Sequence, residues 1–306
     1  MKTLCGLIKE EKGSAIVIVA LCMTILVAMV GAVTDVGIVY ANKWKMTNAV
    51  DAAVLAGAQE LPNNVSEAKN KAIDYASKNG LNPNSLLVNV SADKSEITIE
   101  VQRNVNLLFA KVLGFTKSNV QASATAKVGP LKTLIGAAPL GIEDQPLQYG
   151  NAYVLKTSDS TYGWFGPLSL GGSGASTYKL NLEQGYNNQL KVGDTVPTET
   201  GNMSGPTSTG IEYRIGACDR TPPCTFDNFE RGCPQVLLIP VIRPEQGSGN
   251  QTTTVKIVGF ASFFVDTVSG SGNESIITGY FVNEVKDGDV DFNQTDYGLR
   301  GVKLIK

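Results

Sequence analysis

An uncharged, apolar run near the N-terminus constrains this chain more than any other feature. From Ser14 to Val33 the sequence reads SAIVIVALCMTILVAMVGAV. In an α-helix about 20 residues rise about 30 Å, which is the thickness of the hydrocarbon core of a bilayer. The run therefore predicts a single-pass transmembrane helix, with the lipid bilayer as a partner. The lysines on its two sides favour a cytoplasmic N-terminus at residues 1–13 only slightly (Lys2, Lys9 and Lys12 before it, Lys43 and Lys45 after it).

Two kinds of processing remain open as alternatives to a retained anchor. Val30-Gly31-Ala32 has the small-residue pattern that a signal peptidase cleaves, although the apolar run is longer than the roughly 7–15 residues of a signal peptide. Prepilin cleavage after Gly13 would leave a helix starting at Ser14. Prepilins usually have glutamate at the fifth mature position, where this chain has Ile18. The sequence does not decide whether the N-terminus is cleaved.

The helix is predicted to continue beyond the membrane to about Leu61, because no proline occurs before Pro62. Small residues recur in this outer part and would permit close packing. They could pack on the chain's own domain, or they could form an external stalk that contacts partner helices or a second copy. The candidates for helix contacts are Asp35, Gly37, Ala49, Ala53, Ala56 and Gly57.

Residues 62–129 are predicted to form a small domain with the order α-β-β-α-β. Asn64 and Glu67 have the spacing of a capping box and predict the start of a helix. Residues 96–101 alternate strictly between polar and apolar, as in a half-buried strand, and 120–128 alternate in the same way. Between them the segment LLFAKVLG is predicted to be helical and to end at Gly114. A sheet with helices on one face would satisfy these patterns.

Residues 130–306 predict a mostly antiparallel β-barrel-like or sandwich-like domain, so the fold class is α+β. Gly-, Ser- and Asn-rich turns separate short apolar runs rich in β-branched residues. Short helices are expected at 175–186 and 206–217. The predicted strands lie at 152–156, 164–170, 235–242, 255–265, 276–282 and 298–305.

The residue inventory argues against catalysis. The chain has no histidine, which excludes Ser-His-Asp and Cys-His mechanisms and removes the commonest zinc ligand. Ser204 could act as a nucleophile only with a lysine base such as Lys191. Gly171 to Gly174 lack the Lys-Ser/Thr of a phosphate-binding loop. We therefore predict no enzyme activity and no cofactor. With a net charge of −2 we also expect no nucleic-acid partner.

Two groups of residues could hold a metal ion, and in both a simpler interpretation is favoured. Asp287, Asp289, Asp291 and Asn293 have the spacing of a calcium loop, but Phe292 and Gly298 stand where such a loop needs Gly and Glu. Cys218, Cys224 and Cys233 lie close in sequence but without a C-x-x-C spacing or an obvious fourth ligand. Outside the cell, two of these cysteines would form a disulfide. Cys5 and Cys22 are expected to be free thiols, and no metal is predicted.

The first 130 residues resemble the TadE/TadG-like proteins of the Flp (Tad) pilus assembly system. The resemblance rests on the apolar helix, on Thr34-Asp35-Val36-Gly37 and on the stretch NAVDAAVLAGA at 48–58. It extends to DYASKNG at 74–80 and FAKVLG at 109–114. The von Willebrand A domain of many such proteins, with its D-x-S-x-S metal site, is not found here. The resemblance implies a bacterial, membrane-tethered protein facing outward, with other pilus-assembly or pilin-like membrane proteins as partners.

The resulting hypothesis is a structural or accessory component of a Tad/Flp-type pilus or a related surface assembly. Its C-terminal bulk would lie outside the cytoplasm, and residues 201–233 would form an outward contact surface. The alternatives are a cell-surface module that binds a ligand or glycan in adhesion, and a hydrolase. Aromatic side chains around a pocket would indicate the first, and a lysine or paired carboxylates in a cleft would indicate the second.

Overall fold

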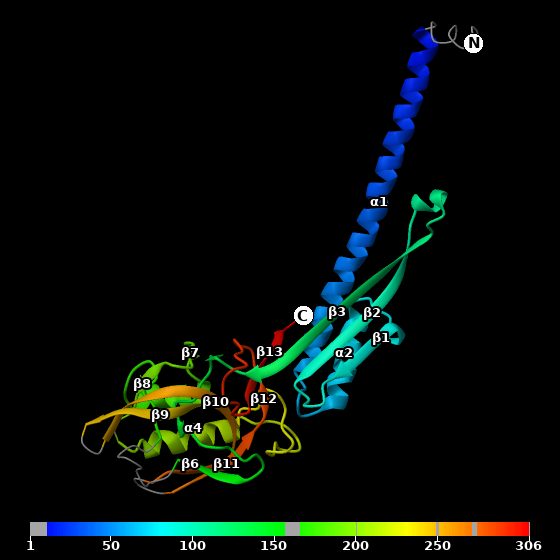
Figure 1. Cartoon of the computed structure of the whole chain (residues 1–306). Coiled ribbons are helices and arrows are strands. Elements are labelled where there is room, and N and C mark those ends of the chain that lie inside the picture. The colour runs from blue at the N-terminus through cyan, green and yellow to red at the C-terminus, as the bar shows by residue number, and fades with distance from the viewer. Residues whose placement is uncertain (1–10, 157–165, 200, 249–250, 271–273, 306) are drawn as a thin grey trace.

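A computed structural model describes residues 11–156, 166–199, 201–248, 251–270 and 274–305. Helix α1, Glu11–Ala58, is one continuous helix that projects from the globular part toward the N-terminus (Figure 1). The predicted helix through the apolar run and beyond it is confirmed. It ends at Ala58, shortly before Pro62, in turns closed by bonds from Glu60 N to Gly57 O and from Leu61 N to Ala58 O. The predictions that concern Lys2, Cys5 and Lys9 lie outside the described residues.

A five-stranded sheet covers the outer half of α1 and has the strand order β1-β2-β3-β13-β12. Its first three strands, Leu86–Val90, Glu96–Asn106 and Lys117–Pro130, are antiparallel. The alternation predicted for 96–101 is confirmed, because Ile97, Ile99 and Val101 point into the core while their neighbours do not. Together with α1 and α2 (Val65–Lys78) they enclose one hydrophobic cluster. The short helix η1, Pro83–Ser85, leads into β1.

Helix α2 begins where the sequence predicts. The side chain of Asn64 accepts a hydrogen bond from the backbone N–H of Glu67 at 3.0 Å, which is the first half of a capping box. Ala68, Ala72 and Ala76 lie on the buried face of this helix and allow it to approach α1 closely. The helix predicted in LLFAKVLG is shorter than expected. Only Ala110–Leu113 form a 3₁₀ turn, η2, at the end of the long β2–β3 hairpin.

The distal part is built on a six-stranded sheet with the order β5-β9-β10-β11-β6, and β8 also pairs with β10. The long strands β9 (Val236–Ser248) and β10 (Gln251–Ser269) form its centre, and β11 (Ile276–Val282) and β6 (Ala152–Lys156) continue it. The predicted barrel-like, mostly antiparallel architecture is confirmed. The remaining short strands are β4 (Thr133–Leu134), β5 (Ile142–Glu143), β7 (Leu190–Lys191) and β8 (Thr195–Pro197).

Two helices cover this sheet, as predicted: α3, Ala175–Gln184, and α4, Ser204–Gly216. Tyr178, Leu182 and Ile211 extend from them into a core with Phe263 and Phe281. The segment predicted as a strand at 164–170 forms only isolated bridges at Pro167 and Leu168, and residues 164–165 lie outside the described ranges.

The last strand returns to the five-stranded sheet, which lies next to the candidate membrane span and is called the membrane-proximal sheet below. β13, Leu299–Leu304, pairs antiparallel with β3, and β12, Glu284–Val285, pairs with β13 (Figure 1). The sequence pattern predicts residues 298–305 to be a strand of the distal domain. The structure instead places them beside β3, with Val302 opposite Val128 and Val285 in the core around α1. The chain therefore passes from the first sheet to the distal part after β3 and returns to the first sheet in β12 and β13, so the two parts are not joined by a single linker at residue 130.

Candidate functional site

The membrane-length part of α1 has no protein cover in this structure. All residues from 15 to 30 are exposed although most are apolar; the side chains of Val27 and Val30, for example, are more than half exposed. By length and composition α1 is the one candidate membrane span among the described residues. An apolar surface of this size is not stable in water, and a bilayer would cover it.

Asp35 joins the end of this apolar run to the β2–β3 hairpin. Its two carboxylate oxygens accept hydrogen bonds from the backbone N–H groups of Leu108 (2.7 Å), Phe109 (3.0 Å) and Ala110 (2.7 Å). These N–H groups stand at the start of η2, where a helical turn has no partner of its own for its first donors. A buried carboxylate with three such donors is well satisfied.

We call residues 107–116 the hairpin tip. One turn before Asp35, Gly31 lies directly against it: a Cβ on Gly31 would come within 2.9 Å of the side chain of Phe109. Below the tip, Lys43 donates to the backbone carbonyl of Gln121 on β3. The helix is therefore attached to the hairpin over several turns. Figure 1 shows the hairpin running beside α1 as far as the middle of the helix.

The small residues of the outer helix lie in the chain's own core. Ala49, Ala53, Ala56 and Gly57 are buried, and the core around α2 and β2 surrounds this face. A Cβ on Gly57 would come within 2.7 Å of the carbonyl oxygen of Ala68. Of the two interpretations left open for this segment, packing on the chain's own domain describes the structure. Contact of these four residues with a partner helix is untested, and it would require this core to open.

The opposite face of the outer helix is exposed and apolar. Val33, Val36, Tyr40 and Trp44 recur at helical spacing and are 59–73% exposed; we call these four residues the exposed stripe. Gly37 lies on the same side, with nothing within 4 Å of the position of a Cβ. Of the six predicted helix-contact residues, Asp35 contacts the hairpin tip, four are buried, and only Gly37 is free for a partner.

The region 201–233, predicted as an outward contact surface, is partly occupied by the chain itself. Arg231 donates to the side chain of Gln59 (2.6 Å) and to its backbone carbonyl (2.9 Å), which ties this region to the end of α1. Phe226 stacks on Tyr280, with ring centroids 4.0 Å apart, and Phe229 lies against Phe264. The loop thus covers its own core, as the simpler interpretation of its aromatic residues proposed.

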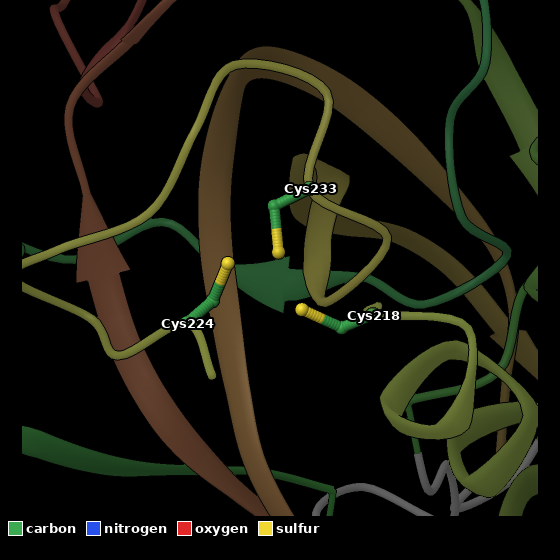
Figure 2. Close-up of side chains that lie close together, drawn as sticks. All are labelled: Cys218, Cys224 and Cys233. Atoms are coloured by element: carbon green, nitrogen blue, oxygen red, sulfur yellow. The ribbon is translucent and has the colours of Figure 1, made fainter. Parts of the chain in front are cut away.

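Cys218, Cys224 and Cys233 converge in this loop (Figure 2). Their Sγ atoms all lie within 4.8 Å of one another, but all three residues are free cysteines, and no pair is at bonding distance. The predicted disulfide is therefore not supported. The backbone N–H of Cys224 lowers the pKa of the Cys218 thiol, whereas burial raises the pKa of Cys233 to about 12. Spacing along the sequence could not show that all three meet at one point.

The other candidate residues lie at a helix start and in separate turns of the described structure. Ser204 begins α4, and no hydrogen bond in the described structure joins it to a lysine. Gly171, Gly172 and Gly174 have positive φ angles of a turn before α3. Asp291 accepts from the backbone N–H of Asn293 within a partly exposed turn. Among the described residues, only the three cysteines form a close group of at least three potential metal ligands.

Comparison with known proteins bears on the helical part of the chain. Residues 13–60 match the family model described as "Tad: Putative Flp pilus-assembly TadE/G-like". Neither the search of curated proteins nor that of solved structures gave a match. The matched residues coincide almost completely with α1, Glu11–Ala58, and include both the candidate span and Asp35. The resemblance to TadE/TadG-like proteins noted from the sequence is thus confirmed over residues 13–60.

Proposed function

We propose that this protein is a membrane-anchored structural component of a Tad/Flp-type pilus or a related surface assembly, with its C-terminal bulk outside the cytoplasm and no catalytic activity. The family match and the candidate span support membrane anchoring in a pilus-assembly system. The observation that carries the structural role is the attachment of Asp35 to the hairpin tip. It fixes the globular part to the helix at the point where the apolar run ends.

A helix that is free of contacts beyond the membrane would act as a flexible tether. Here the outer half of α1 is instead part of the core of the membrane-proximal sheet. The globular part therefore has one height and one orientation relative to the span, which is the property of a scaffold.

The partner surface in this proposal is the exposed stripe. An apolar helix of another pilus-assembly membrane protein would pack along Val36, Tyr40 and Trp44, with Gly37 allowing close approach. Tyr and Trp are the residue types that contribute most at such contacts. The stripe lies within the matched segment 13–60, and it directly continues the exposed apolar face of the span.

Photo-crosslinking in intact cells tests the proposal. A photoreactive amino acid at Trp44 should form adducts with small membrane proteins of the pilus system, and the same residue at the exposed Leu87 of β1 should not. Adducts at Trp44 with a second copy of this chain alone, or equal labelling at both positions, would contradict the proposed partner. Externally added protease should degrade the globular part in intact cells; protection until lysis would contradict the proposed orientation.

A further inference from the structure

The hairpin tip exposes a group of large apolar side chains, and it lies level with the end of the membrane-length run. Leu108, Phe109, Val112, Leu113 and Phe115 are between 46% and 89% exposed. Through Gly31 and Asp35 the tip contacts α1 at the last turns of the run that began at Ser14. A surface with so many exposed apolar side chains requires a cover.

The position of the tip next to the candidate membrane span indicates that lipid covers its apolar side chains. An open groove of about 840 Å³ separates the tip from α1, and its walls include Met23 and Val27 of the span as well as Val112 and Leu113 of the tip. If the span is in the bilayer, Met23 and Val27 are in contact with acyl chains. Because the same groove is continuous with the tip, the lipid that covers the span also reaches the tip.

Most backbone N–H groups of the tip have hydrogen-bond partners within the protein. A segment that enters lipid must satisfy its polar backbone groups within the protein. The N–H groups of Leu108, Phe109 and Ala110 donate to Asp35. The N–H groups of residues 107, 112, 114 and 115 donate to backbone carbonyls of the same tip. The exposed lysines Lys111 and Lys117 can extend their ammonium groups to the lipid headgroups.

We propose that the hairpin tip is a second membrane contact, which inserts into the outer part of the bilayer leaflet on the side of the globular domain. The proposal rests on the membrane anchor of the proposed function. The apolar side chains of the tip would lie among the upper acyl chains, and Lys111 and Lys117 would lie at the phosphate level. The protein would then be attached to the membrane at two points.

Tryptophan quenching by lipids brominated in the upper acyl chains tests this. The full-length protein is placed in vesicles of brominated phosphatidylcholine and phosphatidylglycerol, with Trp44 and Trp164, the chain's two tryptophans, changed to Phe. Three probes are compared: Val112→Trp in the tip, Val27→Trp in the span and Leu87→Trp on β1. Val112 and Leu87 are both exposed, so neither substitution should disturb folding.

We expect Val112→Trp and Val27→Trp to be quenched several-fold more strongly than Leu87→Trp. Quenching of Val27→Trp alone would overturn the lipid contact of the tip while leaving the anchor intact. Quenching of none of the three would overturn the anchor as well. Shielding of Val112→Trp only when other pilus proteins are added would show a protein partner at the tip and would also overturn the proposal.

The three cysteines carry an independent inference. A disulfide joins two sulfur atoms at about 2.05 Å and would leave the third thiol unused. Here three sulfur atoms point toward one another from separate parts of the loop (Figure 2), all within 4.8 Å. In a tetrahedral zinc site with Zn–S bonds of about 2.3 Å, the sulfur atoms are about 3.8 Å apart. A small contraction would bring the three sulfur atoms to three of the four positions of that geometry, and a water molecule would take the fourth.

The geometry points to a binding site for a thiophilic cation, with Zn²⁺ as the reference ion, formed by Cys218, Cys224 and Cys233. Cys224 and Cys233 are buried in a small cluster with Val236 and Phe264, which shields the site from water. Soft thiolate ligands favour Zn²⁺ or Cu⁺ over Ca²⁺ or Mg²⁺. Each sulfur atom that coordinates the ion releases its proton, so binding strengthens as the pH rises.

Zinc titration of the reduced full-length protein in detergent tests this site, with a chromophoric chelator as competitor. We expect one Zn²⁺ per chain, lost in Cys224→Ala and in Cys233→Ala and retained in Cys22→Ser, which removes an exposed thiol elsewhere. In the unaltered protein, Zn²⁺ should also protect all three thiols from alkylation, which checks the result if a variant does not fold. Absence of zinc binding to the reduced, folded protein would overturn the inference. So would a disulfide in the purified protein that persists with no zinc bound.

Discussion

The two halves of helix α1 are both rich in apolar and small residues, but their surroundings are opposite. Residues 15–30 are exposed on all sides, whereas Met46, Val50 and Val54 are completely buried. Residues 15–30 are not buried by any described part of the chain and match a bilayer in length, whereas the outer half lies in the centre of a protein core. Apolar composition alone thus does not tell lipid contact from protein contact. The lipid-facing part of α1 ends, and the protein-facing part begins, where the helix reaches the five-stranded sheet.

Among the variants considered, charged residues in the membrane span should have the largest effect, a loss of membrane insertion. Leu21→Lys combined with Leu26→Lys places two ammonium groups in the candidate span, each at a cost of roughly 3 kcal/mol for membrane insertion. We expect the protein to leave the membrane fraction, as measured by fractionation of cells. Leu87→Lys on β1 is the control and should remain in the membrane. Retention of the double variant would mean that α1 does not span the bilayer.

The next largest effect is expected when a larger side chain is placed in the buried outer half of α1. In Gly57→Leu the new side chain would collide with the Ala68 carbonyl and with Ala72, and we expect a loss of roughly 3 kcal/mol in unfolding free energy. Gly37→Leu, on the exposed side of the same helix, should leave stability unchanged. Chemical denaturation of the detergent-solubilised proteins measures both. Equal stabilities would mean that the outer half does not lie in the core.

A matched pair of truncations compares the two halves directly. Val54→Ala removes two methyl groups from the core and should cost about 2 kcal/mol. Val27→Ala removes the same groups from an exposed position and should leave the unfolding midpoint of the globular part unchanged. A similar loss in both variants would contradict the division of α1 into a lipid half and a protein half.

The smallest effect is expected at the boundary between the halves. Asp35→Asn replaces an acceptor carboxylate by an amide that cannot accept all three backbone N–H groups of the hairpin tip. Hydrogen exchange should become faster at Leu108, Phe109 and Ala110, while exchange in α2 remains the same. Asp93→Asn, in the turn between β1 and β2, is the control. Unchanged exchange at the tip would show that Asp35 does not fix it.

Local patterns predicted those parts of the fold that depend on near neighbours in the chain. The cap at Asn64 predicted α2, and the alternation at 96–101 predicted β2, because each pattern reflects contacts within a few residues. The tip was assigned to a longer helix, since its partner Asp35 lies more than 70 residues away and leaves no local signal. Likewise, the pattern of 298–305 predicted a strand but could not identify β3 as its neighbour.

The sequence selects residues of the candidate site without showing which of them a partner helix would contact. The sequence pattern predicts helix contacts at Asp35, at Gly37 and at small residues between 49 and 57, because small side chains suit packing on the chain's own core as well as on a partner helix. Only the sheet shows which face is covered. The apolar tip was visible in the letters LLFAKVLGF, where hydrophobic residues occupy a turn between two strands. The cluster of three cysteines could not be predicted from the sequence, because the fold of the loop brings their side chains together.

The pairing of β13 with β3 places a condition on how this protein matures. Ribosomes produce the chain from its N-terminus, so α1 and the first three strands are made before the distal part. β13, the strand that pairs with β3, is made only after the distal part. Until then β3 has a row of unpaired backbone groups along one edge, and such edges readily associate with other chains. In the proposed orientation, with the globular part outside the cytoplasm, the membrane-proximal sheet stays incomplete during export until β13 reaches the same side of the membrane. In that interval the exposed edge of β3 must be kept from pairing with other chains.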